Sequence, residues 1–169
     1  GTLAVSPGAT LNVYEAYGAG YPSWTGAAEV AGTLNISRGA FNAHVSSVGN
    51  AAVLKLGFDL SSQVDLGGNL SQFRGTIQIP NGTVHVAVVG ALNTPASIVF
   101  AGTGSPKLDV AGSTSVVGLV SGGSSSAAIN LGGGTLTISG LTNGSYGGAI
   151  TGNGSIVKDG YGAQAFYGN

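Results

Sequence analysis

The chain contains no cysteine and no methionine among its 169 residues. The lack of cysteine excludes disulfide bonds and suits proteins that cross a cell envelope unfolded. Because residue 1 is glycine rather than methionine, we expect the chain to be processed or excised from a longer one. No charged segment followed by an apolar one stands at the start, so we expect any signal peptide to have been removed.

Charge is also scarce. Charged residues make up 7% of the chain, against about 25% in typical globular proteins, and the net charge is -1. Since there is no basic patch, we expect no nucleic-acid partner. The chain lacks a run of about 18 apolar residues, so we expect no transmembrane helix and no membrane insertion. A net charge near zero favours self-association.

Signals for helices are nearly absent. The 32 glycines recur every few residues, and each glycine inside a helix costs about 1 kcal/mol relative to alanine. Val, Ile and Thr dominate the remaining positions and favour strands. Hydrophobic residues reach 43%, a composition unlike that of a disordered chain. The composition therefore predicts an all-β protein.

What the chain has in abundance is one short phrase: glycine, a small polar residue, then two apolar residues separated by a polar one. Copies stand at residues 1–5, 32–36, 75–79, 82–86 and 134–138. Each copy predicts a strand of about five residues with one apolar face, bounded by a turn. One such strand cannot bury its own apolar face, whereas a stack of them can.

Two architectures fit closely spaced strands joined by short loops: a parallel β-solenoid (β-helix) and an antiparallel β-sandwich. Aliphatic residues that repeat in size suit stacked coils, and about 20–25 residues per coil gives roughly seven coils. No linker divides the chain, so we predict a single domain over 1–169 with an aromatic loop at 14–26. The predicted inward-facing residues are Leu3, Val5, Leu11, Val13, Leu34, Ile36, Ile77, Ile79, Val84, Val86, Leu108, Val110, Ile129, Leu131, Leu136 and Ile138.

The stretch 127–169 favours the solenoid. A Gly-Thr-Leu strand at 134–138 is followed by Gly-x-Ile-x-Gly-x-Gly at 148–154 and by an apolar-x-Lys-x-Gly phrase at 156–160. This succession resembles the autotransporter-associated β-strand repeat of bacterial surface and secreted passenger proteins. The resemblance implies a right-handed parallel β-helix that is exported and is not an enzyme. The family pattern continues after residue 160 with a Thr-Leu strand, where this chain has Gln-Ala-Phe-Tyr at 164–167.

The two ends of the chain fit the same pattern. The repeat family continues past an asparagine into a Gly-Thr-Leu strand, and this chain ends in Gly168-Asn169 and begins with that phrase. We expect no amphipathic capping helix and no charged terminal strand. We therefore expect either a segment of a longer passenger or copies that stack head to tail into a filament.

Aromatic residues supply the candidate binding residues. Four rings and one carboxylate fall between residues 14 and 24, and such a set suits a sugar or a protein partner. The alternative is that these rings fold onto the flank of the solenoid. A second aromatic group lies near the other end and would approach the first across a junction between copies. The candidate ligand or interface residues are Tyr14, Glu15, Tyr17, Tyr21, Trp24, Phe166 and Tyr167.

Catalytic and metal sites have weaker signals. Asp59 and Asp65 have an even separation and, on a single strand, would share a face as the carboxylate pair of a glycosidase. His44 and His85 each occupy an outward position with no cysteine and no close histidine or carboxylate in the sequence. We interpret all four as solvated surface residues, and we expect no catalytic residues, no metal and no cofactor.

The sequence thus predicts a secreted or cell-surface structural protein that is not an enzyme and that associates end to end into a fibre. The first alternative is an adhesin or passenger segment that binds a glycan or host ligand through the aromatic loop. The second alternative is an enzyme that acts on polysaccharides.

Overall fold

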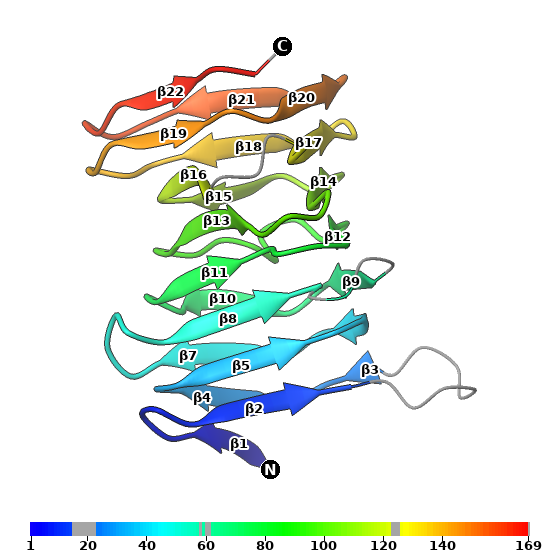
Figure 1. Ribbon diagram of the computed structural model, residues 1–169, viewed down its shortest axis with the longest axis vertical. Coiled ribbons are helices and arrows are strands. Elements are labelled where there is room, and N and C mark those ends of the chain that lie inside the picture. The colour runs from blue at the N-terminus through cyan, green and yellow to red at the C-terminus, as the bar shows by residue number, and fades with distance from the viewer. Residues whose placement is uncertain (15–22, 58, 60–61, 123–125, 169) are drawn as a thin grey trace.

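The computed structural model spans residues 1–169 and describes all of them except 15–22, 58, 60–61, 123–125 and 169. The described residues form strands β1 to β22 and no helix. No helix able to cross a membrane is therefore present in this part of the chain. The strands stack as successive coils, with the N-terminus at one end of the stack and the C-terminus at the other (Figure 1).

One face of the stack is an eight-stranded sheet, here called sheet B, to which every coil contributes one strand. Its neighbouring strands pair in the order in which they occur along the chain. In that order they are β2 (Thr10–Val13), β5 (Thr33–Ile36), β8 (Val53–Leu56), β11 (Thr76–Gln78), β13 (Ser97–Ala101), β16 (Gly118–Gly122), β19 (Gly144–Tyr146) and β22 (Gln164–Phe166).

A second face is the seven-stranded sheet C. From the N-terminal end it contains β3 (Ser23–Trp24), β6 (Gly39–Phe41), β9 (Gln63–Leu66), β12 (Thr83–Val86), β14 (Lys107–Val110), β17 (Ala128–Leu131) and β20 (Ala149–Gly152).

The third face is divided into two short sheets. Sheet A contains β1 (Thr2–Val5), β4 (Ala27–Val30), β7 (His44–Ser47) and β10 (Asn69–Gln72), and sheet D contains β15 (Thr114–Val116), β18 (Thr135–Ile138) and β21 (Ser155–Lys158).

The segment 90–96 lies between sheets A and D and forms no strand. Toward the preceding coil, the Thr94 hydroxyl of this segment donates a hydrogen bond to the carbonyl of Phe73 over 2.7 Å. Toward the following coil, the backbone N–H of Thr94 donates a hydrogen bond to the carbonyl of Ser115 over 3.1 Å. The third face is therefore continuous, although one coil crosses it through an irregular segment.

Every strand pair joins one coil to the next in parallel, for example Leu11 to Leu34 and Leu34 to Leu54. The prediction of an all-β parallel solenoid of about seven turns is thus confirmed. The antiparallel sandwich is excluded because all the pairings between described strands are parallel. The right-handed sense implied by the family resemblance stays a prediction.

The repeated phrase acquires a physical explanation in the fold. Its glycine sits at a corner where the chain passes closely over the preceding coil. A Cβ at Gly75 would lie 2.1 Å from the carbonyl oxygen of Ala52, and one at Gly32 would lie 2.3 Å from that of Ala9. The Thr-apolar-x-apolar residues that follow then form the next strand, as in β5. Glycine marks the corner because a side chain there has no space.

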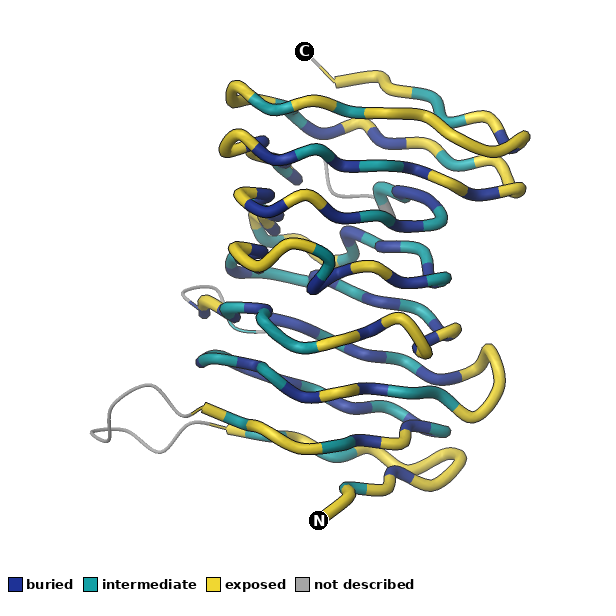
Figure 2. Tube along the Cα trace, turned by 180° about the vertical axis from the view of Figure 1, so that it is seen from behind, coloured by how far each residue is buried: buried dark blue, intermediate teal, exposed yellow. Residues whose placement is uncertain are grey.

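The core follows the alternation of the strands. Burial of apolar residues at every second position produces columns of stacked side chains, such as Leu34, Leu54, Ile77 and Ile98, each 0% exposed. All the predicted inward-facing residues are buried except Leu3, Leu11 and Val13, which are half-buried in the first coil. Figure 2 shows that exposed positions concentrate at both ends of the stack.

In two columns of sheet B, a small residue occupies one position near the C-terminal end, where the other positions hold large side chains. Ser121 follows Phe100 in one column, and Tyr146 comes next, so the two rings meet across the serine with centroids 5.1 Å apart. Burial raises the pKa of the Tyr146 phenol well above its usual range. In the neighbouring column Gly144 provides no side chain, and Gln164 of the following coil reaches past it to the backbone of Leu119.

Candidate binding surfaces

Trp24 is the best-defined member of the predicted aromatic loop. It ends the short strand β3 and is half-buried, with its indole packed on Phe41 of the next coil at a centroid distance of 5.2 Å and an interplanar angle of 50°. Its ring is therefore the first member of a core column. Tyr14 is 63% exposed. Glu15, Tyr17 and Tyr21 lie outside the described residues, so their predicted role is neither supported nor contradicted.

Phe166 and Tyr167 lie at the opposite end of the stack. Phe166 continues the column of Tyr146 and is 42% exposed, because no further strand covers it among the described residues. Tyr167 is 74% exposed, and its N–H donates to the carbonyl of Tyr146. Trp24 and Phe166 thus do not form one site within a single chain. They mark the two end faces of the solenoid.

The N-terminal end face is an open apolar surface. Strands β1, β2 and β3 each pair with one neighbour only, so their outer edges carry unpaired backbone groups. The half-buried side chains Leu3, Leu11, Val13 and Trp24 surround a hollow of about 400 Å³. The same columns are fully buried one coil further in, at Leu34 and Ile36 for example.

The C-terminal end face is more polar. Ile150 and Ile156 are half-buried core positions there. Lys158, however, occupies the column that runs through Val116 and Ile138, and its Nζ donates hydrogen bonds to the carbonyls of Asp159 and Gly160. The expectation that no terminal strand carries a charge is therefore wrong. A lysine at an edge is a common means of protecting a sheet from unwanted pairing.

The predicted carboxylate pair is not formed on one strand. Asp65 points outward from β9, where it accepts a hydrogen bond from Gln63 over 2.7 Å, while Asp59 lies in the connection that precedes this strand. The even spacing of the two residues therefore does not place them on a common face. Within the described ranges no group of three histidine, cysteine or acidic residues is arranged to hold a metal ion.

His85 has carboxylate neighbours on the adjacent strands, although the sequence predicts no carboxylate close to it. It is in register with Asp65 on one side and with Asp109 on the other, so the three form an outward row on sheet C. The signal is present in the sequence: each of the three is the middle residue of an apolar-x-apolar phrase in successive coils. The row is hard to recognise in the sequence because about one coil length separates each of the three residues from the next.

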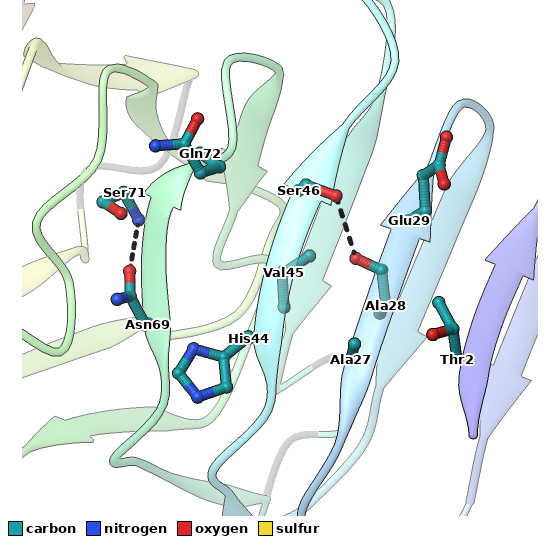
Figure 3. A pocket seen from close by; sticks show the side chains of 10 residues that line it. All are labelled: Thr2, Ala27, Ala28, Glu29, His44, Val45, Ser46, Asn69, Ser71 and Gln72. Atoms are coloured by element: carbon teal, nitrogen blue, oxygen red, sulfur yellow. Dashed lines mark hydrogen bonds between the residues drawn. The ribbon is translucent and has the colours of Figure 1, made fainter.

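His44 belongs to a groove on the outer face of sheet A (Figure 3). The groove has a volume of about 210 Å³. Ten residues of β1, β4, β7 and β10 line it, and all except the buried Ala28 and Val45 are exposed or half-buried: Thr2, Ala27, Ala28, Glu29, His44, Val45, Ser46, Asn69, Ser71 and Gln72. No local sequence motif predicts this site, because each strand contributes at most three of its residues.

Comparisons with known protein families, with curated proteins and with solved structures find no match. The resemblance to the autotransporter-associated repeat, noted above for residues 127–169, therefore stays a prediction.

Proposed function

We propose that this protein is a non-catalytic structural solenoid of the cell surface or extracellular space, and that its copies join end to end. The observation that carries the proposal is the N-terminal end face. There, unpaired strand edges surround an apolar hollow lined by Leu3, Leu11, Val13 and Trp24. Both features are removed from water when further parallel strands stack on that face.

The opposite face offers matching elements. Strand β22 ends sheet B with a free edge, and its last residue, Phe166, is an apolar side chain that no further coil covers in the described chain. Stacking this face on the N-terminal face of a second copy extends the ladder of sheet B and buries Phe166. An interface that joins unlike faces does not close on itself, so it produces filaments rather than dimers.

The low charge of the chain supports the same proposal. With five basic and six acidic residues, self-association meets little electrostatic repulsion. Each coil contributes its own ladder of hydrogen bonds and a few buried aliphatic residues, so length is added without a new kind of contact. The resemblance to exported repeat proteins supports the proposed location outside the cell.

A pair of variants in one strand tests the proposal. Leu11 faces the hollow and Asn12 faces outward in β2. We expect Leu11→Lys to lower the sedimentation coefficient of the full chain to that of a monomer, because a charge is then buried at the junction. Asn12→Lys adds the same charge outside the hollow and leaves assembly unchanged. Circular dichroism of both variants checks that the fold is retained.

Imaging supplies the second measurement. Negative-stain micrographs of the unmodified protein are expected to show rods much longer than one molecule. Trp24→Ala, which removes the largest ring lining the hollow, is expected to shorten them. A protein that sediments as a monomer at millimolar concentration contradicts end-to-end association.

A further inference from the structure

The groove on sheet A is a second surface, which shares only Thr2 with the hollow of the N-terminal end face, and it has a structural origin. Ala27 lies between Thr2 and His44 in one outward row, so a methyl group separates two larger side chains. On β10 the register shifts between Asn69 and Gln72, which pair with His44 and Ser46 of β7. This bulge widens the face and leaves Gln72 exposed at the rim.

The rim of the groove carries hydrogen-bonding groups that have no partner within the described residues. Within the described residues, the side chains of Glu29, His44 and Gln72 make no hydrogen bond or ion pair. The side-chain oxygen of Asn69 accepts the N–H of Ser71 over 2.9 Å, and this bond leaves the amide NH₂ of Asn69 unengaged. Figure 3 shows these groups on neighbouring strands around one depression. The rim therefore offers a carboxylate acceptor, amide donors and an imidazole to one occupant.

The charge of the lining narrows the class of ligand. Glu29 is the one formally charged side chain among the ten lining residues, and neither lysine nor arginine is among them. A phosphate, a sulfate or an acidic sugar would meet a carboxylate with no cation to pair with. The apolar part of the floor is the methyl group of Ala27, because the side chains of Ala28 and Val45 are buried in the core. The site thus combines a small apolar patch at Ala27 with a polar and almost neutral rim.

The volume of the groove further restricts the class of ligand. At about 210 Å³ the groove is smaller than the roughly 300–1,000 Å³ of pockets that hold drug-sized ligands, so it accommodates a single ring. A second hollow of about 250 Å³, lined by Ala4, Ser6, Pro7 and Val48 among others, shares Glu29 with the first. The two hollows provide room for adjacent units of one chain-like ligand.

We propose that the outer face of sheet A binds a neutral carbohydrate, with one sugar ring in the groove and a neighbouring ring beyond Glu29. A pyranose ring presents C–H groups on its faces and hydroxyl groups around its edge. The C–H face packs on the methyl group of Ala27, while hydroxyl groups donate to Glu29 and accept from the amides of Asn69 and Gln72. Among the lining residues of this site, only Thr2 also lines the hollow of the N-terminal end face.

Two alanine positions make a matched test. Ala27 and Ala128 each begin a strand with the same succession of half-buried, buried, exposed and buried residues, on sheets A and C. Ala27→Leu fills the groove, while Ala128→Leu adds the same volume to an outward position elsewhere. The probes are arrayed neutral and acidic oligosaccharides, with binding to any positive one followed by saturation-transfer NMR in solution.

We expect the unmodified protein to bind at least one neutral oligosaccharide. We expect it to bind no acidic oligosaccharide more tightly than the neutral ones. Ala27→Leu is expected to weaken that binding more than tenfold, and Ala128→Leu less than twofold. Glu29→Gln, which keeps the shape of the side chain, is expected to weaken binding at least threefold. Leu11→Lys leaves binding intact, so a failure of end-to-end assembly is distinguished from a failure of this site.

Three results overturn the proposal. They are the absence of binding to every neutral oligosaccharide, equal binding by the Ala27→Leu and Ala128→Leu variants, and preferential binding of acidic sugars or of a protein. If Ala27→Leu unfolds the chain, Glu29→Gln and Gln72→Ala, both at exposed positions, keep the test available.

Discussion

At the scale of single residues, the fold depends on where side chains are absent. Adjacent coils come so close at some corners that a methyl group has no room, as at Gly75, where a Cβ would lie 2.1 Å from the carbonyl oxygen of Ala52. Other glycines are free of this constraint. Gly147 has a negative φ and nothing within 4 Å of its Cβ position. The repeated glycines of the sequence are therefore not equivalent.

This difference is measurable. We expect Gly75→Ala to lower the free energy of unfolding by about 1–3 kcal/mol, because the backbone of two coils must separate. Gly147→Ala should change it by less than about 0.5 kcal/mol, or raise it slightly by restricting the unfolded chain. Urea unfolding followed by circular dichroism measures both, and equal midpoints for the two variants would show that the corner is not tightly packed.

At the scale of elements, the last coils compensate for small residues in their columns. Strand β22 is tied to β16 across β19, because the Gln164 amide donates to the carbonyl of Leu119 over 3.0 Å and accepts its N–H over 3.1 Å. A carboxamide resembles a peptide group, so it satisfies both backbone groups at once. The strand that departs from the repeat pattern at 164–167 is thus the one that fastens the C-terminal end.

Removing this side chain is expected to loosen the end of the stack. Gln164→Ala leaves two backbone groups of Leu119 without these partners, at a cost of about 1–3 kcal/mol. Gln78→Ala, an outward substitution in β11 of the same sheet, serves as control and should cost less than about 0.5 kcal/mol. Amide exchange in β19 and β22 should accelerate in the first variant alone. Unchanged exchange there contradicts the fastening role.

At the scale of the whole molecule, each coil contacts its neighbours and little else. Strand pairs therefore join residues about one coil apart in sequence, such as Val84 with Val64 and with Leu108. Stability in such an array is close to a sum over coils and junctions, and the end coils lack one junction each. The middle of the stack is accordingly the most stable part.

Native-state hydrogen exchange is expected to show this gradient. At low protein concentration, amides of β11 and β12 should exchange at least about 100-fold more slowly than those of β1 and β2, because end coils open without unfolding the centre. At high concentration the difference should shrink if copies cover the end faces. Uniform protection along the chain at low concentration contradicts an additive solenoid.

The sequence was sufficient for the class of fold, because burial in a solenoid repeats along the chain. Leu34 and Ile77 could be assigned to the core from the alternation around them alone. It was insufficient for positions that depend on stacking. The row of Asp65, His85 and Asp109 and the groove around Ala27 arise from registers between coils. Coils of unequal length hide those registers from a scan along one chain.

We expect the irregular segment 90–96 to give the solenoid a preferred direction of bending. At that level the third face is held by individual bonds, such as that from the Ser115 N–H to the side-chain oxygen of Asn93 over 2.8 Å, rather than by a strand. Sheets B and C run past the same level without interruption. A rod with two continuous walls and one jointed wall yields first on the jointed side. Repeated at one place in every copy, such joints would make a fibre of these molecules compliant at regular intervals and stiff between them.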